Sequence, residues 1–138
     1  MDRREAMQYS PLTLAFMGDS VYEQLVRKKL VLSANRPVNS LHKLTTQRVC
    51  AEYQAAAVNM LTEKELLSEE EQDILRRGRN ASGVSAPKHS TVAEYRSATG
   101  LECLFGFLFL TEQHERIDEL FEFIWELNED GTGKDNSL

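Results

Sequence analysis

Pro11-Leu-Thr-Leu-Ala-Phe-Met-Gly-Asp-Ser-Val-Tyr22 is a run of small and apolar residues with a single charge, that of Asp19. A second run, Ser97-Ala-Thr-Gly-Leu-Glu-Cys-Leu-Phe-Gly-Phe-Leu-Phe-Leu110, is charged only at Glu102. Burying an ionised carboxylate costs roughly several kcal/mol unless a cation, a metal or dense hydrogen bonding compensates. The two runs are therefore candidate core helices, and their acids are candidate functional residues.

The neighbours of the two acids narrow what compensates them. If both runs are helices, no Lys or Arg lies within one turn of either acid. Four small residues, Ala15, Gly18, Ala98 and Gly106, would let the helices approach closely and bring the acids together. Converging carboxylates without a basic partner repel each other, and a divalent cation relieves the repulsion. The alternative is that each acid caps a helix or pairs with a distant Arg.

Repeated helix-start signals predict an all-α fold of about six helices. Each signal joins a capping residue to a favourable first turn. The signals are Ser10-Pro11, Asn39 or Ser40, Thr62-Glu-Lys-Glu65, Ser68-Glu-Glu-Glu71, Ser90 or Thr91, and Thr111. No segment alternates with period two for long enough to predict a sheet. Residues 33–39 and 76–89 are expected to be loops, the second rich in Gly, Ser and basic residues.

Length and composition predict one small domain over residues 1–127, followed by a polar tail over 128–138 that we expect to be disordered. No apolar run is long enough to span a membrane. Cys50 and Cys103 are the two cysteines of the chain, and without a signal peptide they are interpreted as reduced thiols of a cytoplasmic protein. No nucleotide-binding glycine loop or Ser/His/Asp order is present, which disfavours a kinase or a serine hydrolase.

The net charge of −6 is unevenly distributed. Residues 63–73 carry six acids and one Lys, and residues 112–130 carry eight acids and one Arg. Residues 76–96 are basic, with only Glu94 opposing. Such a strip favours phosphate binding, although a solvated mobile loop is the alternative. The candidate RNA-binding residues are Arg76, Arg77, Arg79, Lys88 and Arg96.

Several stretches in order along the chain resemble the ribonuclease III family. Leu14-Ala-Phe-Met-Gly-Asp-Ser-Val-Tyr-Glu23 resembles the signature helix of the family, and Leu101-Glu-Cys-Leu-Phe-Gly-Phe-Leu-Phe-Leu110 resembles its second catalytic segment. The stretches between them are similar to the linking region of Mini-ribonuclease III, the compact bacterial branch that lacks a double-stranded RNA-binding domain. They are Leu75-Arg-Arg-Gly-Arg-Asn-Ala81, Pro87-Lys88 and Tyr95-Arg-Ser-Ala-Thr99.

The resemblance implies a ribonuclease III catalytic-domain-like helical bundle and a homodimeric endoribonuclease for double-stranded RNA. It implies Asp19 and Glu102 as catalytic residues that bind Mg²⁺, with Mn²⁺ as a possible substitute. Each subunit would cut one strand, leaving 5′-phosphate and 3′-hydroxyl ends. The implied substrate is the 23S ribosomal RNA precursor, with a large-subunit ribosomal protein as a candidate partner.

Two departures from the family pattern leave the number of metal ions open. Larger members carry acids at the positions of Ala15 and Thr99. Glu23, one turn after Asp19, is a candidate substitute ligand, with a helix ion pair to Arg27 as the alternative. Two rival functions are also compatible with the sequence. One is a non-catalytic RNA-binding or ribosome-associated protein with the same fold, and the other is a helical protein-interaction module that docks through its acidic last helix.

Overall fold

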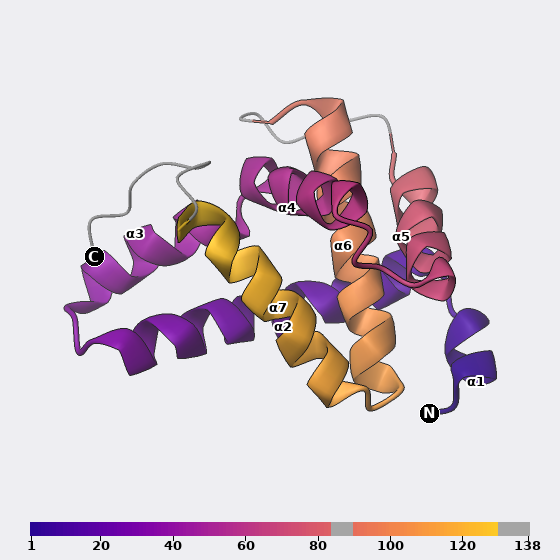
Figure 1. The fold of residues 1–138 in the computed structure, drawn as a ribbon, viewed down its shortest axis with the longest axis horizontal. Helices are drawn as coiled ribbons and strands as arrows, with labels where there is room; N and C mark the ends of the chain where they lie inside the picture. The colour runs from indigo at the N-terminus through magenta and orange to yellow at the C-terminus, as the bar shows by residue number, and fades with distance from the viewer. Residues whose placement is uncertain (84–89, 130–138) are drawn as a thin grey trace.

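The computed structural model describes residues 1–83 and 90–129, which form seven helices and no strand (Figure 1). The helices are α1 (Arg3–Met7), α2 (Pro11–Ser33), α3 (Val38–Val49), α4 (Ala51–Glu63), α5 (Glu69–Ala81), α6 (Val92–Leu110) and α7 (His114–Glu129). The all-α prediction is confirmed. The last helix extends two residues past the predicted domain end, and the rest of the expected tail, residues 130–138, lies outside the described part of the chain.

Helix α6 runs through the middle of the molecule and is packed by α2, α4 and α5 (Figure 1). From Ala98 onward its sequence consists of small and apolar residues around the whole circumference, with Glu102 as the only charge, which is the pattern of a helix buried on all sides. The fully buried side chains of α6 are Leu101, Leu104, Phe105, Phe107 and Leu108. Because Glu102 lies among these residues, it is carried into the centre of the fold.

Helix α5 corrects one sequence prediction, because residues 76–81 are helical and not part of a loop. A Cβ atom at Gly78 would lie 2.6 Å from the Cβ of Cys103, and one at Gly100 would lie 2.7 Å from the Leu75 carbonyl oxygen. These glycines let α5 and α6 come into backbone contact. The tertiary contact outweighs the low helix propensity of Gly78, which made this segment look like a loop.

Three predicted helix starts are confirmed. The side chain of Ser10 accepts from the Leu12 N–H, and Ser68 and Thr91 each close a capping box with a Glu three residues on. Helix α3 begins at Val38, one or two residues before the predicted start at Asn39 or Ser40.

Two predicted starts were wrong, because Thr62 lies in the last turn of α4 and Thr111 follows the last residue of α6. In each case a glutamate takes a left-handed backbone shortly afterwards, with φ of 53° at Glu65 and 60° at Glu112. Such helix ends usually carry glycine, so neither segment contains the usual stop signal.

The helix-start signals did not predict the N-terminal helix α1 or the division between α3 and α4. Asp2 and Glu5 form a capping box that starts α1, and Cys50 takes an extended backbone between α3 and α4. Cys50 is therefore a partly buried residue at a helix junction, whereas Cys103 is buried within α6, and both are free thiols.

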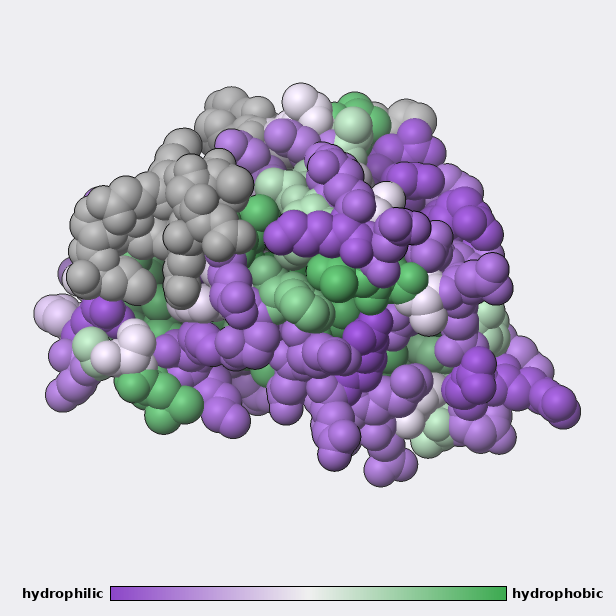
Figure 2. Space-filling view, in the orientation of Figure 1, coloured by the Kyte–Doolittle hydropathy of each residue, from purple (hydrophilic) through white to green (hydrophobic). Residues whose placement is uncertain are grey.

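The face shown in Figure 2 is mainly hydrophilic, with smaller apolar areas between the polar side chains. In the ranges 1–83 and 90–129, no helix has the length and apolar character required to cross a membrane. Under the surface, α7 buries four apolar side chains at helical core spacing. They are Ile117, Leu120, Phe121 and Ile124.

Candidate active site

Helices α2 and α6 cross at two glycines, with their backbones in direct contact. A Cβ atom at Gly18 would lie 1.6 Å from the carbonyl oxygen of Glu102, and one at Gly106 would lie 1.9 Å from that of Leu14. No other residue fits either position without moving a helix. The close approach predicted from the small residues is therefore confirmed, and it places Asp19 beside Glu102.

The two acids differ in exposure. Asp19 is exposed on α2, while Glu102 is partly buried on α6. Burial raises the pKa of Glu102 to about 8, and the charge of Asp19 and a side-chain hydrogen bond with it act in the same direction. Among residues 1–83 and 90–129, neither acid forms an ion pair with a basic side chain. The pairing with a distant Arg is thus not observed in this part of the chain.

Gln54 on α4 is a site residue that the sequence did not indicate. Its side chain is buried, and its Nε2 donates to Oε2 of Glu102 at 3.3 Å and to the carbonyl oxygen of Val49 at 3.0 Å. The hydrogen bond to Glu102 opposes the rise in its pKa. The Oε1 atom of Gln54 is buried and has no hydrogen-bond partner within the described chain. A single Gln in a helix of Ala and Val gives no recognisable motif.

The site is suited to a hard divalent cation, which binds oxygen atoms. Two carboxylates supply the negative charge, and the amide nitrogen of Gln54 contacts one of them. No cluster of three or more His, Cys, Asp or Glu side chains suitable for a metal occurs in the described ranges. A bound cation would therefore rely on two protein charges, completed by oxygens from water, from a neutral protein group or from the substrate phosphate.

Glu23, the candidate substitute ligand, is already engaged, and the residues at the two departures from the family pattern are buried. Glu23 forms an ion pair with Arg27, with Nη2 to Oε2 at 2.7 Å, which is the alternative considered for it. Thr99 is buried and donates its hydroxyl to the Tyr95 carbonyl at 3.0 Å. Ala15 is buried against α6. Glu23 nevertheless lines the same surface groove as Asp19.

A model of the Ribonuclease III domain matches residues 12–113, a range that contains Asp19, Gln54 and Glu102. The chain belongs to the ribonuclease III family.

Relatives named Mini-ribonuclease 3 are similar to this chain over most of its length. One from a Thermoanaerobacter species is 45% identical and covers 88% of this chain and 84% of its own length. One from Symbiobacterium thermophilum is 46% identical, and the match covers 81% of this chain and 85% of the relative. One from Staphylococcus aureus is 41% identical, and the match covers 83% of this chain and 86% of the relative. These matches support the Mini-ribonuclease III branch and the activity of a ribonuclease III-type endoribonuclease.

The fold of this ribonuclease III domain also matches a solved structure. A crystal structure of a protein from Fusobacterium nucleatum superposes with a TM-score of 0.76 at 32% sequence identity. The match covers 85% of this chain and 93% of that chain. It supports the ribonuclease III-like helical bundle that the sequence resemblance implied.

The candidate RNA-binding arginines of this ribonuclease III domain do not form one uniform row. Arg76 is exposed and pairs with Asp73, and Arg79 is exposed at the end of α5. Arg77 is partly buried and donates to the Met7 carbonyl oxygen at 3.4 Å, which ties α1 to α5. The structure thus gives Arg77 a role in packing.

Arg96 extends the basic strip from α5 to the start of α6. Its Nε donates to the carbonyl oxygen of Arg79 at 3.3 Å, so the two residues lie together. Lys88, the remaining candidate, lies outside the described residues.

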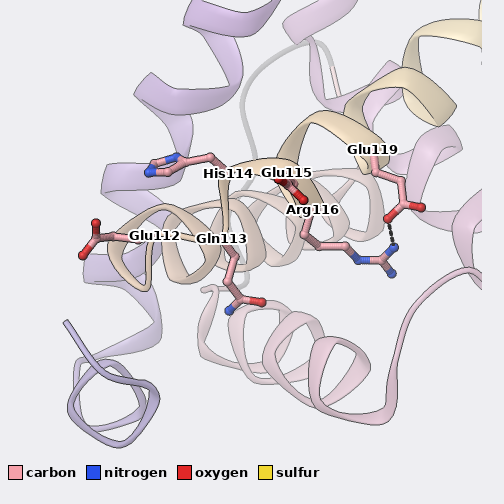
Figure 3. A pocket seen from close by; sticks show the side chains of 6 residues that line it. All are labelled: Glu112, Gln113, His114, Glu115, Arg116 and Glu119. Carbon is pink, nitrogen blue, oxygen red and sulfur yellow. Dashed lines mark hydrogen bonds and ion pairs between the residues drawn. The ribbon is translucent and has the colours of Figure 1, made fainter.

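The acidic segment after α6 forms a separate pocket in the ribonuclease III domain (Figure 3). It is lined by Glu112, Gln113, His114, Glu115, Arg116 and Glu119. The only arginine of the lining pairs with Glu119 and also with the buried Glu71 of α5. The other acids of the pocket lining repel phosphate, so this pocket is a poor candidate for the RNA site.

Proposed function

We propose that this chain is a Mg²⁺-dependent endoribonuclease that hydrolyses double-stranded RNA, with Mn²⁺ as a substitute ion. Asp19 and Glu102 are its catalytic, metal-binding residues. The observation that supports this proposal is the convergence of the two carboxylates at the α2–α6 crossing, without a basic partner among the described residues. Because the pKa of Glu102 is raised to about 8, a cation is needed to keep both acids ionised near neutral pH.

The two acids have different tasks in the proposed reaction. A bound Mg²⁺ would polarise the scissile phosphate and favour ionisation of a water that attacks it. Glu102 anchors the ion from the core side, where α6 fixes its backbone against Gly18. Asp19 holds it at the surface, where a phosphate can approach. Hydrolysis of the P–O3′ bond gives a 5′ phosphate and a 3′ hydroxyl.

The basic strip is the proposed contact for the RNA backbone. Arg76, Arg79 and Arg96 lie on the described part of α5 and α6, and Lys88 is proposed to act with them. A-form duplex is recognised mostly through its shape and backbone, which suits arginines without a base-reading element. The acidic faces of the molecule then point away from the RNA.

A homodimer is the proposed assembly, with the α2 surface as its interface. The side chain of Phe16 is 83% exposed, although it lies on the same helix as Asp19 and only one turn before it. Leu12 on the preceding turn is also exposed. Contact between two copies would bury this apolar strip beside the groove that contains Asp19. Two subunits would then cut the two strands of one duplex.

Sedimentation equilibrium tests the dimer. Phe16→Asp should shift the protein towards monomer, because the charge would be buried in the interface. Leu32→Asp is the matched control, since Leu32 is 74% exposed at the other end of α2. A wild-type monomer, or an equal effect of both variants, would contradict the proposed interface.

The proposed biological substrate is the 23S ribosomal RNA precursor in the cytoplasm, with a large-subunit ribosomal protein presenting it. The similarity to Mini-ribonuclease 3 proteins supports this assignment. Incubation with precursor RNA, with and without ribosomal proteins, tests it by mapping the ends produced. Random cutting of the precursor would argue against this substrate.

Duplex cleavage separates the proposed enzyme from a non-catalytic RNA-binding protein. The assay compares end-labelled double-stranded and single-stranded RNA of one sequence, with Mg²⁺ or with chelator. The proposal expects Mg²⁺-dependent cutting of the duplex alone, with products that a 5′-phosphate-dependent exonuclease degrades. Binding of the duplex without cutting would favour the non-catalytic alternative.

A further inference from the structure

We propose that Gln54 is a positioning residue for Glu102, which holds this carboxylate in the orientation that binds the cation. The inference deepens the metal site given under the proposed function and rests on it. The contact that carries it is the hydrogen bond from Gln54 Nε2 to Glu102 Oε2, at 3.3 Å. It joins α4 to α6, two helices that pack along each other in the core.

A purely local role for Gln54 is the alternative, and the chain contains a direct comparison. Gln54 is the fourth residue of α4, and its Nε2 donates to the carbonyl of Val49, five residues earlier, at 3.0 Å. Gln72 is the fourth residue of α5, and its Nε2 donates to the carbonyl of Leu67, also five residues earlier and at 3.0 Å. Both glutamines therefore satisfy a carbonyl at the start of their helices.

What distinguishes Gln54 is its surroundings. Gln72 is exposed, whereas Gln54 is 2% exposed and makes its second contact with an acid of the site. A helix start needs only the first contact, which an exposed glutamine makes equally well. The burial and the second contact thus call for an explanation beyond the local one.

The orientation of the amide group follows from its partners. The Val49 carbonyl and the Glu102 carboxylate both accept hydrogen bonds, so the amide nitrogen must face them. The oxygen Oε1 is then buried without a partner among the described residues. Buried polar atoms rarely lack a hydrogen-bond partner. Oε1 is bonded to the same carbon as the nitrogen that contacts Glu102. The contact of Gln54 with the acid pair is therefore made by its nitrogen, which donates to Glu102 and restrains the orientation of that carboxylate.

The expected consequence concerns metal affinity. Partners that orient a ligating side chain typically change metal affinity about 10- to 100-fold when they are removed. In Gln54→Leu, Glu102 loses the donor that orients its carboxylate. We expect the dissociation constant for Mn²⁺, measured without RNA, to rise by at least about tenfold. Gln72→Leu removes the same local contact and should leave that constant unchanged.

The experiment has two parts, and the first uses the unaltered protein. The side-chain NH₂ resonances of Gln54 and Gln72 are followed by NMR during titration with Mg²⁺. The proposal expects the Gln54 signal to shift and the Gln72 signal to remain in place. An unmoved Gln54 signal at saturating Mg²⁺ would overturn it, and this result does not depend on whether a variant folds.

The second part is calorimetric titration of RNA-free protein with Mn²⁺, for wild type, Gln54→Leu, Gln72→Leu and Asp19→Asn. Weak binding by Gln54→Leu beside normal binding by Gln72→Leu supports the inference. Equal binding by Gln54→Leu and wild type, with binding lost in Asp19→Asn, overturns the role of Gln54 and leaves the metal site intact. Normal binding in Asp19→Asn instead contradicts the proposed function itself.

Discussion

Replacing Glu102 by Gln should stabilise the metal-free protein at alkaline pH. The pKa of Glu102 is about 8 in the folded chain and 4.5 as a free side chain, because burial and Asp19 disfavour its charge. Between these values the unfolded chain loses a proton that the folded chain keeps, so the free energy of unfolding falls as the pH rises from 4.5 to 8. The neutral amide avoids this loss, and its oxygen can still accept from Gln54.

The size of the effect follows from the displacement of the pKa. At about 1.4 kcal/mol for each tenfold change in proton affinity, the full displacement corresponds to at most about 5 kcal/mol. Water reaches part of the Glu102 side chain, so we expect about 1–3 kcal/mol. For a chain of this length, that amounts to roughly 3–9 °C in melting temperature.

The assay is thermal unfolding by circular dichroism in chelator, at pH 5 and pH 8.5 and at one protein concentration. Glu102→Gln should melt close to wild type at pH 5 and above it at pH 8.5. Glu52→Gln, at an exposed position on α4, is the control and should follow wild type at both values. If wild type melts at least as high as Glu102→Gln at pH 8.5, burial of the ionised Glu102 carboxylate does not destabilise the fold, and the prediction is wrong.

Three further predictions test the parts of the site separately. Gly18→Ala should lower the melting temperature strongly and abolish cleavage, because its Cβ would lie 1.6 Å from the Glu102 carbonyl, and a variant that melts like wild type would contradict the close crossing. Arg79→Ala should reduce the slope of log affinity for duplex RNA against log salt by roughly 0.9, whereas Arg77→Ala should mainly lower the melting temperature; binding titrations in Ca²⁺ compare the two. Thr99→Asp should lower the Mg²⁺ concentration for half-maximal cleavage, because it adds a carboxylate one turn before Glu102, and an unchanged midpoint in a folded variant would argue against an incomplete metal shell.

The sequence alone predicted those parts of the candidate site that lie within an apolar run. Asp19 and Glu102 stood out because each is a lone charge among core residues, and the glycines nearby predicted the close crossing that the structure confirms. The contribution of Gln54 was not predictable, because it depends on how α4 packs against α6. A polar residue in one helix does not indicate which distant side chain it meets.

The basic strip shows the opposite limitation. Gly78 and the neighbouring arginines have the composition of a loop, but the helix continues because Gly78 allows contact with α6. The same packing fixes which arginines are free to meet RNA. Arg77 was indistinguishable from Arg79 in the sequence, yet it contacts α1 through Met7. Charge predicted the strip, and only the tertiary structure separates its members.

The most direct test of the account is the Mg²⁺ dependence of duplex cleavage by wild type, Asp19→Asn and Glu102→Gln. All three are first shown to be folded by their melting curves, and the rate is then measured from zero to saturating Mg²⁺. Wild type is expected to cut only when Mg²⁺ is present, and neither variant is expected to cut at any concentration. Cleavage by wild type in chelator, or a wild-type rate in either variant, would contradict a metal site formed by Asp19 and Glu102.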